Sequence, residues 1–188
     1  MIKTRNDLKF FIHEDKKRNI QDIGILRYWW LLLCGSEQAH AFRYIKAMRH
    51  LEYHINNKGF VHSILKNYYK IRIGRLGLRY HVDIQPNSCG YGFRLLHLSS
   101  GGVLLNAKKI GNYCGFNAGV LIGNKDLQEN RPTIGDYVAF GPGAKAFGEI
   151  TIGNNVFVAP NAVVAKDVPN NMIVGGIPAK IIKYNKQQ

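Results

Sequence analysis

Apolar residues recur at intervals of six along the second half of this 188-residue chain. Steps of six from residue 110, with one gap of twelve, meet nine apolar positions: Ile110, Phe116, Ile122, Ile134, Phe140, Ala146, Ile152, Val158 and Val164. The next residue is usually small or polar: Gly111, Asn117, Gly123, Gly135, Gly141, Gly153, Ala159 and Ala165. A second small or branched set lies four positions after the first: Cys114, Val120, Val138, Ala144, Ile150, Val156, Ala162 and Val168. Self-similarity at a fixed period indicates a repeat architecture.

This period predicts a solenoid of short parallel strands. Three short strands make one triangular coil, so about eighteen residues return the chain to its starting corner, one strand spacing higher. The apolar residue points into the narrow interior, and glycine or asparagine at the following corner tolerates unusual backbone angles. A β-sandwich is the alternative, but alternation with period two would not hold nine apolar residues in phase at multiples of six.

The gap in the pattern falls at Gln128, within the polar segment from Asn124 to Pro132. Since twelve residues are two full repeats, we expect the coil to resume in register after this segment. Such interruptions project from a solenoid as loops, and loops on solenoids commonly carry function.

Residues 1–79 differ in composition and in the spacing of their apolar residues. They contain no proline and few glycines, and their apolar residues recur at helical spacing, as in Phe42, Ile45, Met48 and Leu51. This spacing predicts about three amphipathic helices. Ser36 is expected to begin one of them, and residues 57–59 to separate two others. The chain therefore divides into an α-helical N-terminal region, 1–79, and a β-helix domain, 80–188.

The formal net charge of +14 is concentrated in the helical region. Residues 1–79 carry 16 Lys and Arg against 6 Asp and Glu, a net +10, whereas the β-helix domain carries +4. Aromatic residues lie among the basic ones, at Tyr28, Trp29, Trp30, Tyr68 and Tyr69. A nucleic-acid-binding or membrane-surface module is therefore a rival interpretation. Because no recognisable nucleic-acid motif accompanies the charge, we expect no nucleic-acid partner, and either trimer contacts or weak contact with an anionic membrane surface.

Cysteine usage and hydropathy bear on the compartment. The three cysteines lack metal-type pair spacing, and the N-terminus lacks the apolar core of a signal peptide. The longest apolar run, from Ile25 to Cys34, contains Arg27 and covers about half of the roughly 20 residues that span a bilayer. We expect a cytoplasmic protein that is at most peripheral to the inner face of the membrane.

The segment from residue 162 to 182 resembles the closing coil of the hexapeptide acetyltransferases, a family that includes serine, galactoside and maltose acetyltransferases; it reads AVVAKDVPNNMIVGGIPAKII. The order of helices, then Asp83-Ile-Gln-Pro86, then Leu95-Leu-His97, is similar to serine acetyltransferase and to related enzymes of bacterial polysaccharide clusters. The resemblance covers residues 80–182 well and the helices loosely. It implies a left-handed parallel β-helix whose stacked triangular coils form a prism. It also implies a homotrimer with sites between the prisms of adjacent chains, and acetyl-CoA as donor without a metal.

In those relatives the histidine of the matching motif is the general base, and His97 occupies its position. A neutral imidazole can accept the proton of an acceptor hydroxyl as the oxygen attacks the thioester carbonyl. Asp83 matches the aspartate that orients this histidine in serine acetyltransferase, although the interval is one residue shorter here. The alternative for Asp83 is a cap of the turn before the first coil. The other histidines lack such a motif and are expected at the surface or in helix packing.

The resemblance also implies a donor site. Galactoside acetyltransferase relatives bind the pantetheine arm along small residues of the coils, and the nucleotide phosphates with basic side chains near the end. The matching groove positions are Gly141, Gly143 and Ala159, and the matching phosphate contacts are Lys166 and Lys180. Small residues let the extended arm approach the backbone, and lysine suits phosphate as a point charge. The geometry of the coil corners explains the two glycines equally well.

Departures from the serine enzyme bear on the acceptor. That enzyme has an acidic residue directly before the histidine and an Arg-His pair before the later proline, where this chain has Leu96 and Asn130-Arg131. The missing carboxylate removes a partner for an amino acid's ammonium group. We therefore expect Asn130 and Arg131 to contact a sugar or glycan acceptor of bacterial surface polysaccharide biosynthesis, which would be O-acetylated. Serine O-acetylation in cysteine biosynthesis is the alternative.

Two other β-helix functions fit the sequence less well. The γ-type carbonic anhydrases bind zinc through histidines on neighbouring coils, and no histidine follows His97. A catalytically inactive structural β-helix is disfavoured by the retained histidine and closing coil. The expectation is therefore an acyltransferase with no metal.

Overall fold

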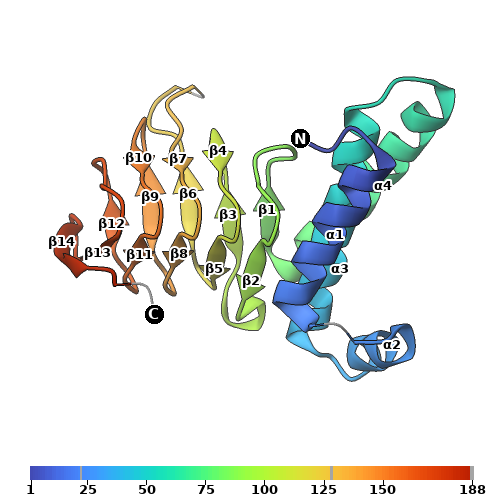
Figure 1. Ribbon diagram of the computed structural model, residues 1–188, viewed down its shortest axis with the longest axis horizontal. Coiled ribbons are helices and arrows are strands. Elements are labelled where there is room, and N and C mark those ends of the chain that lie inside the picture. The colour runs from blue at the N-terminus through green and yellow to red at the C-terminus, as the bar shows by residue number, and fades with distance from the viewer. Residues whose placement is uncertain (22, 128, 187–188) are drawn as a thin grey trace.

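The computed structural model describes residues 1–21, 23–127 and 129–186 (Figure 1). Within these ranges four helices come first: α1 Arg5–Ile20, α2 Ile25–Leu33, α3 Glu37–Ile55 and α4 Phe60–Tyr80. A stack of short strands follows, and the helices lie at its N-terminal end (Figure 1). The predicted order of a helical region followed by a β-helix is confirmed. The helix beyond the predicted three is α2, which lies within the longest apolar run of the sequence, a run that Arg27 interrupts.

A side-chain capping box and a glycine set two of the helix boundaries. Thr4 Oγ1 accepts from the Asp7 N–H at 3.0 Å, and Asp7 Oδ2 accepts from the Thr4 N–H at 2.8 Å, which closes a capping box at the start of α1. Gly59, with φ of 121°, separates α3 from α4 in a conformation that residues with a side chain rarely adopt. Ser36 precedes α3 as predicted, although its side chain makes no cap hydrogen bond.

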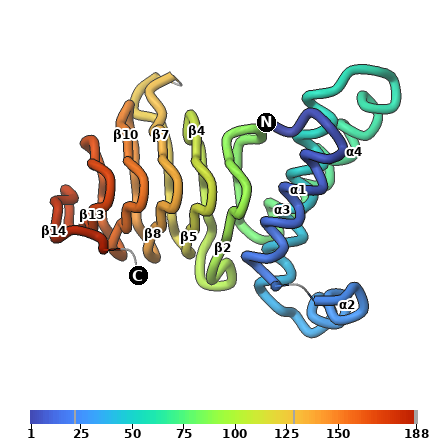
Figure 2. Tube along the Cα trace, in the orientation of Figure 1, coloured from blue at the N-terminus to red at the C-terminus, as the bar shows by residue number. Residues whose placement is uncertain are grey.

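The described strands form three parallel sheets that the chain visits in turn. The five-stranded sheet contains β1 Val82–Ile84, β3 Val103–Leu105, β6 Leu121–Gly123, β9 Lys145–Phe147 and β12 Val163–Val164. The three-stranded sheet contains β4 Lys109–Ile110, β7 Thr133–Ile134 and β10 Thr151–Ile152. The six-stranded sheet contains β2 Arg94–Leu96, β5 Gly115–Asn117, β8 Ala139–Phe140, β11 Phe157–Val158, β13 Met172–Gly175 and the antiparallel β14 Lys180–Tyr184. Successive coils stack along one axis as a parallel β-helix (Figure 2).

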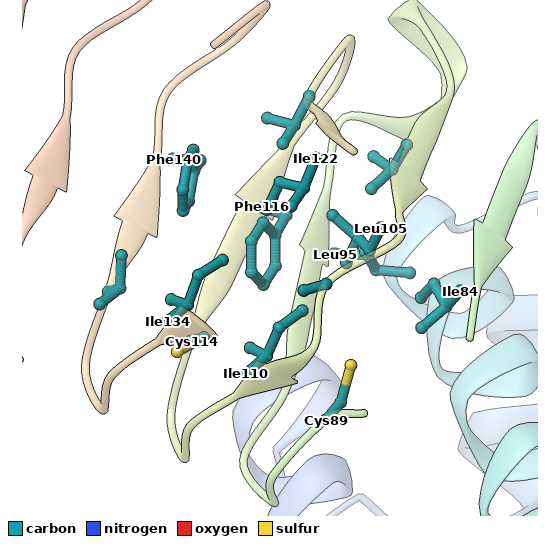
Figure 3. Close-up of a cluster of buried hydrophobic side chains, with 14 of the residues drawn as sticks. Ile84, Cys89, Leu95, Leu105, Ile110, Cys114, Phe116, Ile122, Ile134 and Phe140 are labelled. Carbon is teal, nitrogen blue, oxygen red and sulfur yellow. The ribbon is translucent and has the colours of Figure 1, made fainter. Parts of the chain in front are cut away.

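The interior is filled by the residues that the six-residue period selects. All nine positions of the first apolar set are at most 1% exposed, and every member of the second set is buried. Figure 3 shows Ile110, Phe116, Ile122, Ile134 and Phe140 converging from successive strands on the same interior. The Phe116 and Phe140 rings stack with centroids 5.3 Å apart. The hydrophobic interior of the prism is therefore confirmed position by position.

The corners follow a different rule from the predicted one. The glycine after an inward residue does not supply the unusual backbone angle; the residue two positions later does, as at Tyr113, Tyr137 and Asn155, with φ of 55°, 57° and 54°. Gly135 is instead required by close approach, because a Cβ there would collide with the Asn154 side-chain oxygen of the next coil. The prediction is wrong for Gly111, Gly135, Gly141 and Gly153, because close stacking on the next coil, and not backbone rotation, selects them.

A ladder of side-chain amides and carboxylates explains that close approach. The N–H of Asn112 donates to Asp136 Oδ1 at 2.6 Å, the N–H of Asp136 to Asn154 Oδ1 at 2.8 Å, and the N–H of Asn154 to Asn170 Oδ1 at 2.7 Å. Each oxygen satisfies a corner N–H that lies outside the strand ladders. The ladder thus joins successive coils along the edge between the three-stranded and six-stranded sheets.

The segment from Asn124 to Pro132 adds one repeat to a single coil. Ala139 pairs with Gly115, 24 positions earlier, whereas Phe157 pairs with Ala139, 18 positions earlier. Because the difference of six is one repeat, the inward phase is preserved, and the predicted return to register is confirmed. Gln128, the predicted gap position, lies outside the described residues.

A buried ion cluster joins the helices to the first coil. Arg49 of α3 is fully buried, and its Nε lies 2.8 Å from Asp15 Oδ2 of α1 while its Nη1 lies 3.0 Å from Glu52 Oε2. The same guanidinium donates to the carbonyl oxygens of Cys89 at 2.9 Å and Gly90 at 2.5 Å. Burial opposes the charge, but the two carboxylates raise the pKa of Arg49 above its ordinary value, so it stays protonated.

Candidate active site

Most of the predicted site residues lie along one edge of the prism. We call this corner, between the six-stranded and five-stranded sheets, the His97 edge. Strand pairing aligns its successive coils, since Leu96 pairs with Asn117, Phe116 with Phe140, and Phe140 with Val158. The edge is made by residues 97–102, 118–120, 141–144 and 159–162. His97, Gly141, Gly143 and Ala159 are therefore on the same edge. Gly141 and Gly143 share one coil, and His97 and Ala159 lie on other coils along the prism axis.

His97 turns the chain out of β2. Its backbone is left-handed, with φ of 57°, and it precedes the short 3-10 helix η1, Leu98–Ser100. Its side chain is 63% exposed, and Nδ1 lies 4.0 Å from Glu37 Oε2. Glu37 Oε1 accepts from the Ser99 N–H at 2.9 Å, which fixes the carboxylate beside the histidine. The first turn of α3 thus places an acidic group at the predicted base.

Sequence reasoning missed Glu37. The residue lies 60 positions before His97, and an acidic residue directly after Ser36 has an ordinary explanation at a helix N-terminus, where negative charge is favourable. A separation of 4.0 Å is too long for a hydrogen bond. Glu37 Oε2 is therefore near the imidazole without being hydrogen-bonded to it.

Asp83 lies in β1 with an exposed side chain. It lines a hollow of about 660 Å³ between α4 and the five-stranded sheet, together with His81 and Gly102. Gly102 belongs to the His97 edge, so this hollow opens beside the corner that carries the histidine. Within the described residues, the carboxylate found within 4.0 Å of His97 is that of Glu37. The orienting role of Asp83, and its alternative as a turn cap, remain predictions.

The small residues of the His97 edge have structural reasons to be small. A Cβ on Gly141 would lie 2.7 Å from the Pro160 nitrogen of the next coil, and Gly143 has φ of +70°. Ala159 lies one coil above Gly141 and is half-buried. Coil geometry therefore accounts for both glycines, and it also leaves the edge without bulky side chains. Their contact with the pantetheine arm remains a prediction.

The two predicted phosphate contacts are separated. Lys180 begins β14 and pairs with Gly175, whose added Cβ would lie 3.1 Å from the Ala159 Cβ, so Lys180 lies at the C-terminal end of the His97 edge. Lys166 follows β12 and is exposed at the corner between the five-stranded and three-stranded sheets. We call this second corner the loop edge. One chain does not bring the two lysines together.

Asn130 and Arg131 also lie on the loop edge. Arg131 Nη1 donates to Gln85 Oε1 and, at 3.4 Å, to Asn106 Oδ1. The Asn130 carbonyl accepts from the Lys125 N–H at 3.2 Å. These contacts hold the loop against the prism, and within one chain they place neither residue at His97. Acceptor binding by Asn130 and Arg131 remains a prediction.

Other reactive groups are few in the part of the chain that the structure describes. Burial raises the pKa of the Cys89 and Cys114 thiols to about 12 each, so neither is a thiolate near neutral pH. No three His, Cys, Asp or Glu side chains of the described residues gather as metal ligands would. The exposed imidazole of His97 is therefore the group best placed to accept a proton on this edge.

Comparison with known proteins finds relatives of the chain, although no protein-family model matches it. Serine acetyltransferase of Synechococcus elongatus is 36% identical over 104 residues, which are 54% of this chain and 42% of that protein. The serine acetyltransferase of Mycobacterium tuberculosis is 33% identical over 103 residues, 54% of this chain and 45% of that protein. The chain thus spans less than half of the length of these two curated relatives.

Solved structures extend the likeness to the helices. A Neisseria gonorrhoeae serine acetyltransferase in complex with serine superposes with a TM-score of 0.71 and 26% identity, covering 93% of this chain and 69% of that one. A Brucella abortus serine acetyltransferase has a TM-score of 0.71 and 21% identity, covering 97% of this chain and 71% of that one, a likeness of fold alone. In sequence and in its left-handed β-helix fold, the chain resembles the hexapeptide-repeat acetyltransferases, and serine acetyltransferase among them.

Proposed function

We propose that the chain is an acetyl-CoA-dependent O-acetyltransferase with His97 as its general base. The observation that carries the proposal is an exposed imidazole on an edge of the β-helix that is otherwise lined by small residues. The acceptor hydroxyl gives its proton to His97 while its oxygen attacks the thioester carbonyl carbon. The carbon–sulfur bond then breaks, and the proton passes from the imidazolium to the leaving thiolate of CoA.

The acceptor that we propose is serine. The expected sugar acceptor finds no support among the named relatives, which are serine acetyltransferases. The objection to serine was the loss of a carboxylate at Leu96. Glu37 answers it, because it brings a carboxylate oxygen within 4.0 Å of His97 and leaves that oxygen available to an ammonium group.

A sugar hydroxyl is the second candidate, and two observations favour it. Leu96, directly before His97, is half-buried and apolar, and Arg131 is engaged with Gln85 and Asn106. Two of the polar groups that would hold an amino acid are therefore missing or occupied within one chain. The Glu37 carboxylate can equally accept hydrogen bonds from the hydroxyls of a sugar.

An acceptor assay separates the two candidates. We expect thiol release from acetyl-CoA with serine, and Glu37→Gln to raise the KM for serine by about 10-fold or more, because a charge-assisted hydrogen bond is worth about 1.5–3 kcal/mol. Glu14→Gln, which removes a carboxylate of α1 that accepts from the Tyr113 hydroxyl away from both edges, is the matched control and should leave this KM unchanged. Thiol release with nucleotide sugars or oligosaccharides, and none with serine, would replace serine by the second candidate.

We also propose a homotrimer in which neighbouring prisms complete each site. His97 and Lys180 lie on one edge and Lys166, Asn130 and Arg131 on another, so a second chain is needed to bring the two sets together. In such an assembly the loop edge of one chain faces the His97 edge of its neighbour.

Mixed assemblies test this arrangement. Co-refolded His97→Asn and Lys166→Glu chains should regain a substantial part of the activity that each variant lacks alone, because some sites would combine an intact His97 with a neighbour's intact Lys166. If both residues served a site within one chain, every site would carry a defect and no activity would return. Light scattering on the wild-type chain should give the mass of a trimer.

A further inference from the structure

Helix α2 presents apolar side chains on two opposite sides. Tyr28, Leu31 and Leu32 are half-buried, and the Tyr28 ring meets Phe42 of α3 edge-on at 5.8 Å. The other side is exposed to solvent: Ile25 72%, Leu26 83%, Trp29 57%, Trp30 65% and Leu33 83%. The i, i+4 spacing of these five residues makes one continuous outer face. An apolar face of this kind without a partner marks an interaction surface.

The figures show that α2 stands apart from the rest of the molecule. It lies at one end of the helical bundle, away from the β-helix, and extends beyond α1, α3 and α4 (Figures 1 and 2). None of the residues of α2 is buried. The outer face can therefore meet a flat surface without interference from the prism.

A basic pocket adjoins this face. Trp29 lines a hollow of about 250 Å³ together with Arg43, Lys46 and Arg72. The adjacent hollow of about 340 Å³ adds Arg75. In the described part of the chain the ion pairs lie at Arg49 and His97, and none involves these four cations. The pocket is thus a concentration of positive charge without a carboxylate to balance it.

The electrostatics of the neighbouring histidine reflect this charge. Burial, followed by the charges of Lys46, His54 and Arg72, lowers the pKa of His50, which lines the same hollow, to about 4. His50 is therefore neutral at physiological pH and does not add to the charge. Within the described residues, Arg43, Lys46 and Arg72 have no carboxylate partner, so an anionic partner would have to come from outside the chain.

This charge distinguishes between the possible partners. A second copy of the chain would bring another helical region of net charge +10 against the first, and the two basic pockets would repel each other. A phospholipid surface offers both missing elements, because its headgroup phosphates match the cations and its acyl region accepts the outer face of α2. Tryptophan is enriched at that depth of a membrane, and interfacial helices combine Trp and Leu on one face with flanking basic residues.

We propose that α2 and its adjoining basic pocket dock the protein on an anionic phospholipid surface. The outer face of α2 enters the interface between headgroups and acyl chains, and Arg43, Lys46 and Arg72 bind lipid phosphates. The helix lies in the surface and does not cross it, since no helix of the described residues has the length and hydropathy of a membrane span. The docking site is separate from the His97 edge and does not depend on the proposed acetyl transfer.

The chain contains its own reporter for this contact. Its two tryptophans are Trp29 and Trp30, both on the outer face of α2. We expect their fluorescence to shift to shorter wavelength when vesicles of phosphatidylcholine with phosphatidylglycerol are added to the full-length protein, and the protein to sediment with those vesicles. Vesicles of phosphatidylcholine alone should produce a much smaller shift, and added salt should weaken binding because it screens the headgroup charge.

Two double variants separate the apolar and the ionic contributions. Leu26→Gln with Leu33→Gln leaves both tryptophans in place and should lower the partition coefficient by more than about tenfold, because two leucines no longer leave water. Arg43→Gln with Arg72→Gln should lower it by about fivefold for each charge removed. All four residues lie at the surface or are half-buried, so the fold, checked by circular dichroism, should be retained.

Matched controls come from other surfaces. Phe60→Gln removes an equally exposed apolar residue at the start of α4, and Lys109→Gln removes an exposed cation of the β-helix. Neither should change vesicle binding. The proposal is overturned if anionic vesicles leave the tryptophan emission unchanged. It is also overturned if the blue shift occurs without vesicles and rises with protein concentration, since a second copy would then cover α2.

Discussion

Arg49→Met is expected to lower the free energy of unfolding by about 3–5 kcal/mol, the cost of removing one partner from a buried ion pair. Methionine keeps much of the volume but leaves the carboxylates of Asp15 and Glu52, which are 0% and 2% exposed, without their cation. It also strips the Cys89 and Gly90 carbonyls of their donors. Chemical denaturation, followed by circular dichroism, measures the change.

Two further variants show whether the cause is the stranded charge. Arg75→Met, at an exposed arginine of α4, should stay within about 0.5 kcal/mol of the wild type. Asp15→Asn combined with Arg49→Met should be less destabilising than the sum of the single changes, because one of the two unpaired carboxylates is gone. An Arg49→Met protein as stable as the wild type would show that the ion cluster adds little stability. Its contribution would then be to fix how the helices pack on the first coil.

The β-helix could be predicted from sequence because each of its coils repeats the same physical requirement. A narrow triangular interior admits an apolar residue at a fixed interval, and the nine selected positions are all buried. The close approach between coils was not visible in the sequence, since glycine explains a left-handed turn and a tight contact equally well. Gly135 shows the difference, because its space is taken by the Asn154 side chain of the next coil.

The spacing of apolar residues could not predict the contact between the helices and the prism. Arg49 counted as one of many basic residues of a charged region, and nothing local shows that Asp15, 34 positions earlier, meets it in the interior. Glu37 was not identified from the sequence for the same reason, since its closeness to His97 depends on how α3 packs on the first coil. A motif such as the one around His97 can be recognised in the sequence because related enzymes repeat it. Contacts between distant segments can be identified only once the fold is known.

His97→Asn is expected to lower acetyl transfer by about 10² to 10⁴-fold, the usual contribution of a general base. Asparagine keeps polarity and approximate size but cannot accept a proton near neutral pH. Because the side chain is 63% exposed, the fold, the oligomer and acetyl-CoA affinity should be nearly unchanged, as calorimetry would show. His13→Asn, at an exposed histidine of α1, is the control and should leave turnover intact. Near-normal turnover of His97→Asn on its true acceptor would overturn the mechanism.

Combining this change with removal of each nearby carboxylate assigns their roles. Glu37 lies too far from Nδ1 for a hydrogen bond, so Glu37→Gln should raise the acceptor KM by the same factor in the wild type and in His97→Asn, as independent effects do. Asp83→Asn, if Asp83 orients the imidazole, should lose turnover in the wild type and almost nothing more in His97→Asn, because residues that act as a unit are not additive. Asp83→Asn with unchanged turnover would make Asp83 a turn cap. A non-additive loss for Glu37→Gln would instead make Glu37 the orienting carboxylate of His97.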